Sequence, residues 1–455
     1  MDAYSTFCLN GTTHPFSDRD DPRESLLRWL KRHRLTGTKE GCGDGDCGAC
    51  TVAEVLREGD SNRLRAVNSC LLPMGQVLGR SFVTVEALAT KDEVHPVQRA
   101  MVRCAGSQCG YCTPGFVMSL FVGFHEDTLG DHCIDGNLCR CTGYTTIRQA
   151  MAEVAAVPTS ERPRALPRFI DQDPGFTPRS APTFLTPATV AEAIANKTAH
   201  PDYVWITGAT DTGVALSRGQ PVAPGFIALD RIDELQQVHR RESSWRIGAG
   251  VTLSQLEDQL GDDLPIITEV LPWFAARQVK NRATLGGNIG SASPIGDLLP
   301  CLLALDAVIE LAGPNGRRPV AAADYFLDYR RTARHNDELV TAVTFDVSPG
   351  RQAFYKVAKR QTDDISIVAA AFLVDTDSTG VIRFVRLAYG GVAAIPKRAR
   401  DTEAFLLGRT LDPGTVDEAV SKLASEFAPL SDHRASKEYR MALIGNLFRQ
   451  FVEAA

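Results

Sequence analysis

Cysteines are the residues of this sequence whose type and spacing could do chemistry. The chain has 455 residues and 12 cysteines, and eleven of the cysteines precede residue 142. We expect no secretory signal, and in a reducing compartment clustered cysteines favour metal binding or catalysis over disulfides. Eight of them form two sets by spacing: Cys42, Cys47, Cys50 and Cys70, and then Cys109, Cys112, Cys139 and Cys141.

The first set has the form Cys42-x4-Cys47-x2-Cys50, and Cys70 follows after nineteen intervening residues. This is the plant-ferredoxin spacing, in which four thiolates hold a [2Fe–2S] cluster. Glycines in the string GCGDGDCGAC let the backbone approach such a cluster and direct N–H groups at its sulfurs. Zinc is the alternative, but zinc sites usually show two separated Cys-x2-Cys pairs. The spacing therefore favours an iron–sulfur cluster.

The second set pairs Cys109-x2-Cys112 with Cys139-x-Cys141 after a gap of twenty-six residues. Each pair directly precedes a predicted helix, and the positive end of a helix dipole favours an anionic cluster. Standing beside the first set, this second set predicts a second [2Fe–2S] cluster. The remaining cysteines are predicted to be small buried hydrophobic residues, with Cys133 as the one serious rival ligand. These remaining cysteines are Cys8, Cys104, Cys133 and Cys301.

Short strands and helices are predicted to position the two sets. Residues 1–80 have the pattern of a small α+β fold, with a loop at 41–50. Residues 92–155 have a helical pattern, and Pro114 stands where the first turn of a helix tolerates proline. The predicted strands are 5–9 and 51–55, and the predicted helices are 25–34, 96–105, 114–124 and 146–154.

The rest of the chain is predicted to be a proline-rich linker and a long α/β segment. Seven prolines lie between residues 157 and 187, and such a stretch should be extended. Thr252 and Gln255 have the spacing of a capping box that opens a helix. The predicted helices are 189–196 and 436–452, and the predicted strands are 203–207, 244–248, 308–311, 338–345 and 381–389.

Composition excludes several function classes. The chain is 44% hydrophobic and 23% charged, with a formal net charge of −6 and a pI of about 5.9. Because no basic block stands out, we expect no nucleic-acid binding. No apolar stretch reaches the roughly 18 residues that span a bilayer. We therefore expect a cytoplasmic protein that does not enter membranes.

The sequence resembles the xanthine dehydrogenase and aldehyde oxidase family of molybdenum hydroxylases. GTKEGCGDGDCGACTV, GSQCGYCTPGFVMS and GNLCRCTGYTTI resemble the two iron–sulfur domains of that family. RQVKNRATLGGNIGSASPIGDLLP and LAYGGVAAIPKRA resemble its FAD domain, and the closing SDHRASKEYRMALI resembles the flavoprotein C-terminal domain. The likeness covers nearly the whole chain outside the proline-rich linker.

This resemblance implies an α+β multidomain fold. It comprises a ferredoxin-like β-grasp [2Fe–2S] domain, a helical-bundle [2Fe–2S] domain, and an α+β FAD-binding domain with a C-terminal α/β flavoprotein subdomain. The expected boundaries are 1–85 and 86–156 for the two cluster domains, 157–182 for the linker, 183–348 for the FAD-binding domain and 349–455 for the C-terminal domain.

Two Gly/Thr-rich turns are the candidate flavin loops. Residues 208–213 and 284–288 could present N–H groups and hydroxyls to a pyrophosphate, although glycine also marks ordinary loops. A Rossmann fingerprint is not met, because Leu253 stands at the third glycine position after Gly248 and Gly250. The resemblance implies flavin contacts at Trp205, Ile206, Thr207, Gly208, Ala209, Thr210, Asp211, Thr212, Phe274, Thr284, Gly287, Asn288, Ser293, Asp297, Val340 and Lys356.

This sequence departs from its relatives at several of these positions. The family often has Asn and Glu where this chain has Ala209 and Asp211, and Ser where it has Thr284. Pro272 stands where some relatives have a basic residue, so access of NAD to the flavin could differ. The resemblance places Tyr329 and Asp363 on the NAD side of the flavin. It directs Gln108 toward the pterin of a partner.

By this resemblance, the chain is the electron-transfer small subunit of a bacterial xanthine dehydrogenase that oxidises hypoxanthine and xanthine to urate. Electrons would pass from molybdopterin on a large partner subunit through two [2Fe–2S] clusters to FAD and then NAD⁺. The chain would supply no catalytic residue to the purine step. Relatives pair two small and two large subunits. The alternatives are another molybdenum hydroxylase, with an aldehyde or N-heterocycle substrate and another acceptor, and a zinc-stabilised binding module.

Overall fold

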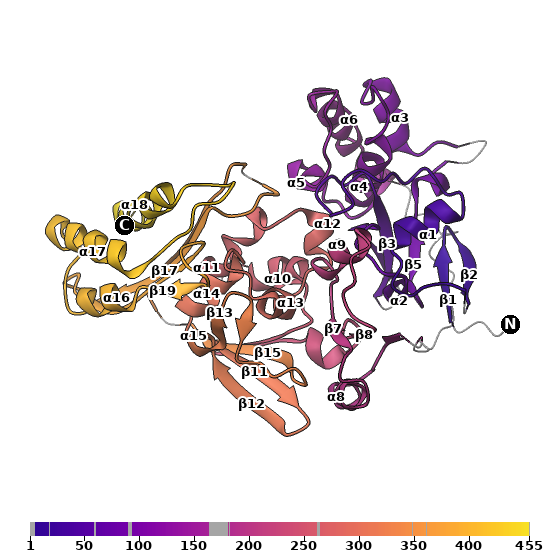
Figure 1. Cartoon of the computed structure of the whole chain (residues 1–455). Coiled ribbons are helices and arrows are strands. Elements are labelled where there is room, and N and C mark those ends of the chain that lie inside the picture. Colours follow the sequence, from indigo (N-terminus) through magenta and orange to yellow (C-terminus); the bar gives the residue numbers. More distant parts are fainter. Residues whose placement is uncertain are drawn as a thin grey trace. The chain divides into compact units, whose positions relative to one another are not determined.

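The protein is described from a computed structural model covering residues 5–454, except 18, 59–60, 90–92, 163–180, 182, 262–263, 348 and 361. The chain divides into two compact units (Figure 1). Unit 1 comprises Met1–Pro187, Asp202–Arg231 and Ala275–Ala283, and unit 2 comprises Ala188–Pro201, Ile232–Phe274 and Thr284–Ala455. Most of the predicted linker lies outside the described residues.

Unit 1 begins with a mixed sheet in the order β2-β1-β5-β3-β4. Strand β1 is parallel to β5, and the other pairs are antiparallel. Ser25 caps the first helix by accepting a hydrogen bond from the N–H of Arg28 at 3.3 Å. The predicted strands and helix in this region are confirmed. The elements are β1 (Ser5–Leu9), β2 (Thr12–Phe16), α1 (Leu26–Arg32), β3 (Thr51–Glu58), β4 (Ser61–Asn68), α2 (Met74–Val77), β5 (Ser81–Val83) and η1 (Val85–Ala87).

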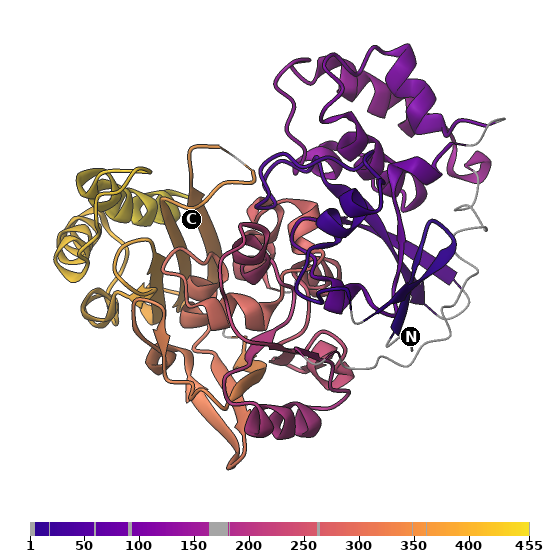
Figure 2. The same ribbon diagram turned by 45° about the vertical axis from the view of Figure 1, so that its right-hand side comes forward.

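A group of helices follows in unit 1. Helix α4 is apolar on all sides, as expected of a core helix, and is buried from Gly115 to Phe124. Helices α3 and α6 lie side by side in both ribbon views (Figures 1 and 2). The three predicted helices and the place of Pro114 in the first turn are confirmed. The elements are α3 (Pro96–Arg103), α4 (Thr113–His125), α5 (Asp131–Ile134), α6 (Thr145–Ala155) and η2 (Thr159–Glu161).

A small parallel sheet, in the order β6-β8-β7, also belongs to unit 1. Strand β8 is buried along its length. Phe184 of β6 packs on the backbone of Gly75, where an added Cβ would lie 2.3 Å from the ring. The elements are β6 (Phe184–Leu185), β7 (Val204–Ile206), α9 (Thr212–Ser217), β8 (Phe226–Ala228) and α12 (Arg277–Lys280).

Unit 2 contains an antiparallel sheet in the order β12-β11-β15-β10-β9. The capping box is confirmed, because Thr252 and Gln255 exchange side-chain-to-backbone hydrogen bonds at the start of α10. Gly248 ends β10, and the chain turns from there into this helix. The elements are α8 (Val190–Ala199), η3 (Asp233–Gln236), β9 (Val238–Arg241), β10 (Ser244–Gly248), α10 (Leu253–Leu260), α11 (Pro265–Thr268), η5 (Leu271–Trp273), α13 (Leu285–Ser291), α14 (Leu298–Ala304), β11 (Val308–Gly313), β12 (Gly316–Ala321), α15 (Ala322–Tyr325), β13 (Phe326–Asp328), β14 (Arg331–Thr332) and β15 (Leu339–Asp346).

The C-terminal part of unit 2 is a second antiparallel sheet, β16-β17-β18-β19, with helices packed on it. Strand β17 is a continuous apolar run and contacts helices α14 and α18. Helices α16, α17 and α18 gather at the same end of the chain in Figures 1 and 2. The elements are β16 (Arg351–Val357), β17 (Val368–Thr376), β18 (Ile382–Gly390), β19 (Lys397–Arg398), α16 (Arg400–Leu406), α17 (Pro413–Glu426) and α18 (Lys437–Glu453).

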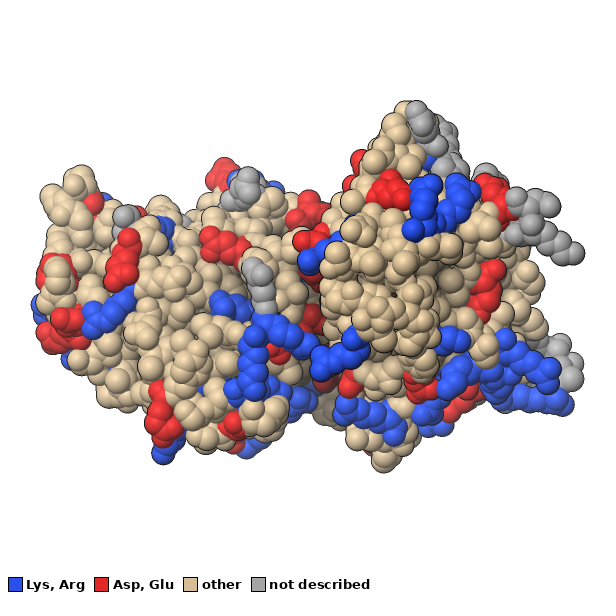
Figure 3. All heavy atoms as spheres, turned by 90° about the horizontal axis from the view of Figure 1, so that it is seen from above, with Lys and Arg blue, Asp and Glu red and all other residues tan. Residues whose placement is uncertain are grey.

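The surface carries charges of both signs. On the face shown in Figure 3, basic and acidic side chains are interspersed and much of the area carries neither. Within the described ranges, every helix is too short or too polar to span a bilayer.

Candidate functional site

The first cysteine set lies on an irregular loop between α1 and β3, together with Cys70 after β4. The N–H of Cys42 points at Sγ of Cys47 at 3.3 Å, and the N–H of Cys47 points at Sγ of Cys42 at 3.3 Å. Gly48 has a φ of +62°, in the left-handed region that favours glycine. The loop therefore turns its backbone N–H groups toward its own sulfurs, as a cluster site requires.

Thiol–thiol hydrogen bonds divide the first set into two pairs. A hydrogen bond from Cys42 lowers the pKa of Cys47 to about 6, and the same bond raises the pKa of Cys42. In the buried pair, a hydrogen bond with Cys70 lowers the pKa of Cys50, while the pKa of Cys70 is raised well above its usual value. The pairs are Cys42 with Cys47 and Cys50 with Cys70.

The second set is paired in the same way at the starts of α4 and α6. Sγ of Cys141 lies 3.5 Å from Sγ of Cys109. Burial and a hydrogen bond with Cys139 raise the pKa of Cys112 to about 12. Although burial opposes it, the pKa of Cys139 is lowered by Thr142, whose N–H lies 3.4 Å and whose hydroxyl lies 3.1 Å from the sulfur.

Paired thiols fit a two-iron cluster better than a single zinc ion. A [2Fe–2S] cluster with four cysteines has two ligands on each of its two irons, whereas zinc needs four ligands around one centre. The pairing in both sets is therefore the arrangement expected for [2Fe–2S] ligands.

The other cysteines lie apart from these pairs. Cys133 donates to the carbonyl of Ser119 at 3.1 Å, and burial raises the pKa of Cys133 to about 12. Cys8 and Cys301 are buried as predicted. Cys104 and Cys133 differ from the prediction, because both are only partly buried. Cys104 ends α3, where its sulfur lies 3.6 Å from Glu153.

The first candidate flavin loop, residues 205–212, connects β7 to α9 in unit 1. Gly208 approaches the chain so closely that an added Cβ would lie 1.9 Å from the carbonyl oxygen of Arg282. Ala209 has a φ of +62°, an uncommon conformation for a residue with a Cβ. Ile206, Gly208 and Ala209 are buried and Asp211 is exposed, while Trp205, Thr207, Thr210 and Thr212 are half-buried.

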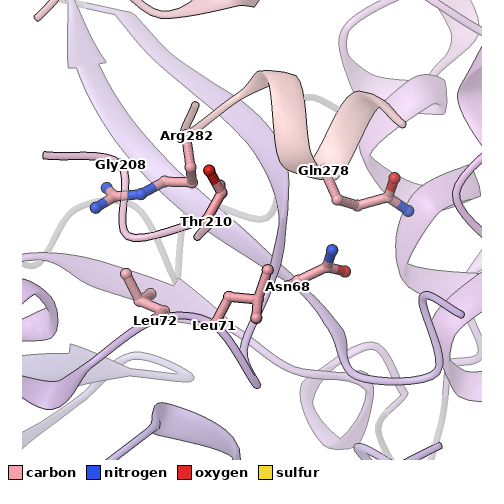
Figure 4. A pocket seen from close by; sticks show the side chains of 7 residues that line it. All are labelled: Asn68, Leu71, Leu72, Gly208, Thr210, Gln278 and Arg282. Atoms are coloured by element: carbon pink, nitrogen blue, oxygen red, sulfur yellow. The ribbon is translucent and has the colours of Figure 1, made fainter. Parts of the chain in front are cut away.

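A small cavity separates this loop from the first cysteine set (Figure 4). Its floor includes Leu71, which follows Cys70 directly. In Figure 4, Asn68 and Gln278 lie on one side and the guanidinium of Arg282 on the other. The lining residues are Asn68, Leu71, Leu72, Gly208, Thr210, Gln278 and Arg282.

The second candidate flavin loop, residues 284–288, opens α13 in unit 2. Thr284 caps the helix, and its hydroxyl accepts a hydrogen bond from the N–H of Gly287 at 3.0 Å. Oδ1 of Asn288 is buried and has no hydrogen-bond partner among the described residues. A buried carbonyl oxygen normally has a donor, so this atom fits a polar ligand group such as those of FAD.

Lys356 and Asp297 form a buried ion pair in unit 2. Nζ of Lys356 lies 2.8 Å from Oδ2 of Asp297 and donates to the carbonyl of Trp273 at 2.8 Å. Ser366 donates to Oδ1 of Asp297 at 2.6 Å. The structure thus brings together the predicted flavin residues Asp297 and Lys356 and ties them to the backbone beside Phe274.

The remaining predicted residues are described by their position and exposure. Val340 is buried in β15, and Phe274 and Ser293 are half-buried. Tyr329 is 59% exposed in the turn between β13 and β14, and Asp363 has a φ of +49° in the loop after β16. Gln108 is exposed beside Cys109. The NAD and pterin roles of these residues stay predictions.

The sequence pattern did not predict the buried polar residues around both cysteine sets. Asn137 and Gln278 are 2% and 1% exposed. Glu54 is buried in β3 with Arg80 and Arg282 around it. Polar side chains are usually solvated, and in these residues long-range packing supplies the burial.

Three sequence families match parts of the chain. "[2Fe-2S] binding domain" matches residues 84–152, and "FAD binding domain in molybdopterin dehydrogenase" matches residues 178–345. "CO dehydrogenase flavoprotein C-terminal domain" matches residues 353–455.

Similar proteins are oxidoreductases. A chain of Cu,Mo-CO dehydrogenase in a cyanide-inactivated form is 31% identical with a TM-score of 0.56, and the match covers 59% of this chain and 96% of that one. Reconstituted CO dehydrogenase from Oligotropha carboxidovorans is 29% identical with a TM-score of 0.57, and the match covers 60% of this chain and 97% of that one. Xanthine dehydrogenase of Emericella nidulans is 30% identical over 92% of this chain and 36% of its own length. The chain thus spans little more than a third of the xanthine dehydrogenases it matches.

Proposed function

From the premise that the chain belongs to the xanthine dehydrogenase/CO dehydrogenase family, we propose that it is the electron-transfer subunit of a xanthine dehydrogenase. Two [2Fe–2S] clusters would carry single electrons from a molybdopterin-binding partner, and FAD would pass a hydride to NAD⁺. The chain's own residues would hold and insulate these groups. Oxidation of hypoxanthine and xanthine to urate would take place on the partner.

The observation that carries this proposal is the packing of α9 on the first cysteine set. Val214 of α9 packs against Cys50, Cys70 and Leu71 in one apolar cluster. An added Cβ on Gly213 would lie 2.4 Å from the carbonyl oxygen of Leu71. Helix α9 begins where the first candidate flavin loop ends. One apolar cluster therefore joins two thiols of the first set to the helix that follows the first candidate flavin loop, which supports electron transfer between cluster and flavin.

Exposure of the second cysteine set supports a partner at that site. Cys109 and Cys141 are exposed, and Tyr111 and Leu138 beside them are 51% and 41% exposed. Exposed apolar side chains around a redox site favour docking of another protein. We place the molybdopterin subunit there, with Gln108 toward the pterin, in a complex of two small and two large subunits.

The finer assignments are part of the same proposal. They include the β-grasp and helical-bundle folds, the domain boundaries given above, and the flavin contacts of the two loops and of Phe274, Ser293, Val340 and the Asp297–Lys356 pair. Tyr329 and Asp363 are assigned to the NAD side of the flavin.

Copurification with its partner tests the proposal. We expect ~4 iron atoms per chain in two clusters, bound FAD, two EPR signals after reduction, and NAD⁺ reduction with xanthine. A colourless preparation that contains zinc and no iron would show that the chain is a binding module. Clusters and FAD without xanthine-dependent NAD⁺ reduction would refute the assigned substrate and acceptor.

The solved relatives favour a second candidate. Both structures described above are CO dehydrogenases that match nearly their full length. The chain could therefore serve another molybdenum hydroxylase with a different substrate or acceptor. In that case the clusters and FAD would be present and reducible by a different substrate, such as an aldehyde or an N-heterocycle.

A further inference from the structure

Gln278 connects α12 to both cysteine loops of unit 1. Its Nε2 donates to Oδ1 of Asn137 at 3.1 Å and to Oγ of Ser119 at 3.1 Å. Asn137 in turn donates from Nδ2 to the carbonyl oxygen of Gly48 at 3.1 Å. Gly48 lies between Cys47 and Cys50, and Asn137 precedes Cys139 by two residues. Two buried amides therefore lead from α12 to the backbone of both loops.

The two cysteine loops touch through their backbones at the same place. The N–H of Leu138 donates to the carbonyl oxygen of Cys47 at 3.0 Å. A Cβ on Gly48 would lie 2.1 Å from the carbonyl oxygen of Gly136, and a Cβ on Gly136 would lie 2.2 Å from Oε1 of Gln278. Neither glycine has room for a side chain, so Gln278 closes a tightly packed junction.

The side chain of Gln278 takes part in this junction through its amide N–H groups, which donate hydrogen bonds. Oδ1 of Asn137 accepts hydrogen bonds from both Gln278 and Ser119, the latter at 2.7 Å. Oε1 of Gln278 is buried without a hydrogen-bond partner among the described residues. An unpaired buried carbonyl oxygen is unfavourable, so the contribution of the Gln278 amide to the junction comes from its N–H donors.

We propose that Gln278 is a positioning residue that sets the separation and orientation of the two [2Fe–2S] clusters, and with them the electronic coupling between the clusters. This inference rests on the proposed function, in which both cysteine sets hold clusters. Helix α12 lies in sequence between Phe274 and Thr284, two candidate flavin residues. The segment between two flavin contacts would thus also complete the junction of the clusters.

The test compares Gln278→Leu, Gln278→Glu and the control Val279→Ala in the full chain with its partner. Val279 lies in the same short helix and is half-buried, and its truncation leaves the amide of Gln278 in place. The readouts are EPR of the fully reduced protein and the reduction potential of each cluster. We expect Gln278→Leu to lose the spin–spin splitting between the clusters and to shift both potentials, and Val279→Ala to match the parent protein.

Gln278→Glu supplies a readout that a purely structural role would not give. An ionised carboxylate cannot donate to Asn137, but a protonated one can, and burial raises the pKa of a carboxyl group. The EPR splitting and potentials of this variant should therefore approach those of the parent as the pH falls. It also serves if Gln278→Leu does not fold.

Three outcomes overturn the inference. It fails if a loaded Gln278→Leu protein keeps the parental splitting and potentials, if Gln278→Glu shows no pH dependence beyond that of the parent, or if Val279→Ala changes the signals equally. Absence of two cluster signals from the parent protein would instead refute the proposed function, so the two failures are distinguishable.

Discussion

Each thiol pair predicts what a single cysteine variant should lose. Cys70→Ser removes one ligand from the buried Cys50–Cys70 pair, so we expect the first cluster to be lost and the iron content to fall by about half. Cys112→Ser should do the same to the second cluster. Iron analysis and EPR measure both effects.

The matched control for these variants is Cys8→Ala. Cys8 is buried in unit 1, and burial raises the pKa of its thiol. Iron content and both EPR signals should be unchanged in this variant. Survival of both signals in Cys70→Ser would contradict the assignment of the first set.

Ala209 carries backbone strain in the first candidate flavin loop. Its φ of +62° costs a residue with a Cβ roughly 1 kcal/mol relative to glycine. We expect Ala209→Gly to raise the free energy of unfolding by about that amount, as measured by urea titration of the purified protein.

Ala228→Gly is the control for that change. Ala228 is buried in the strand β8, where glycine should lower the free energy of unfolding by roughly 0.5–1 kcal/mol. An Ala209→Gly variant as destabilised as Ala228→Gly would show that Ala209 carries no backbone strain.

At the scale of elements, helices α3 and α4 meet at a buried pair of histidines. Nε2 of His95 lies 3.1 Å from Nε2 of His125, and Nδ1 of His95 accepts from the N–H of Val97. Burial lowers the pKa of His95 to about 3 and that of His125 to about 4. Both rings are therefore neutral in the folded protein near neutral pH.

This pair predicts loss of stability in acid. The folded-state pKa values lie below the unfolded value of about 6.5, so the unfolded chain binds protons first as the pH falls from about 6.5 toward 4. His125→Gln keeps an acceptor for His95 and does not titrate. We expect urea titrations at pH 7 and pH 5 to differ less in this variant than in the parent protein, by up to about 2 kcal/mol.

His239→Gln is the corresponding control, because His239 is exposed on β9. It should keep the parental pH dependence. An unchanged difference between the two pH values in His125→Gln would show that the buried pair does not control acid stability.

At the scale of the molecule, a buried charge network connects distant parts of the chain in unit 1. Glu54 lies 2.8 Å from both Arg65 and Arg80, and Arg80 lies 2.7 Å from Asp230. Arg282 joins Asp230 at 3.5 Å. Burial alone would raise the pKa of Glu54, but the surrounding arginines outweigh burial and hold that pKa well below its usual value.

Glu54→Gln should therefore destabilise unit 1 by about 3 kcal/mol, because the arginines of the network would keep Asp230 but lose the Glu54 carboxylate. Urea titration at neutral pH measures this. The contribution of Glu54 is present above its unfolded pKa of about 4.5 and is lost as the pH falls below it, so the deficit of the variant should shrink in acid.

Glu310→Gln provides the contrast. Glu310 pairs with Arg246 at 2.9 Å, and the side chains are 25% and 30% exposed. Partial solvation should limit its effect to under about 1 kcal/mol. Equal losses in the free energy of unfolding from Glu54→Gln and Glu310→Gln would show that burial does not increase the contribution of the Glu54 network to stability.

Sequence patterns over a few residues predicted the candidate ligands and many of the helices and strands of this protein. Cysteine spacing predicted both ligand sets before any fold was known, because much of each set lies on short loops whose geometry is local. Alternating and helical apolar patterns predicted β1, β10, α4 and α18, and the capping box of Thr252 and Gln255 predicted the start of α10. These features depend on residues a few positions apart, so the sequence alone could define them.

Tertiary structure alone decided how these parts are joined. The approach of Cys112 to Cys139, and the junction of Gln278 with Asn137 and Gly48, bring together residues up to 230 positions apart. Gln278 and Glu54 are polar residue types that are usually exposed to solvent. They are buried because distant segments supply their hydrogen-bond and charge partners, and a local pattern carries no record of such partners.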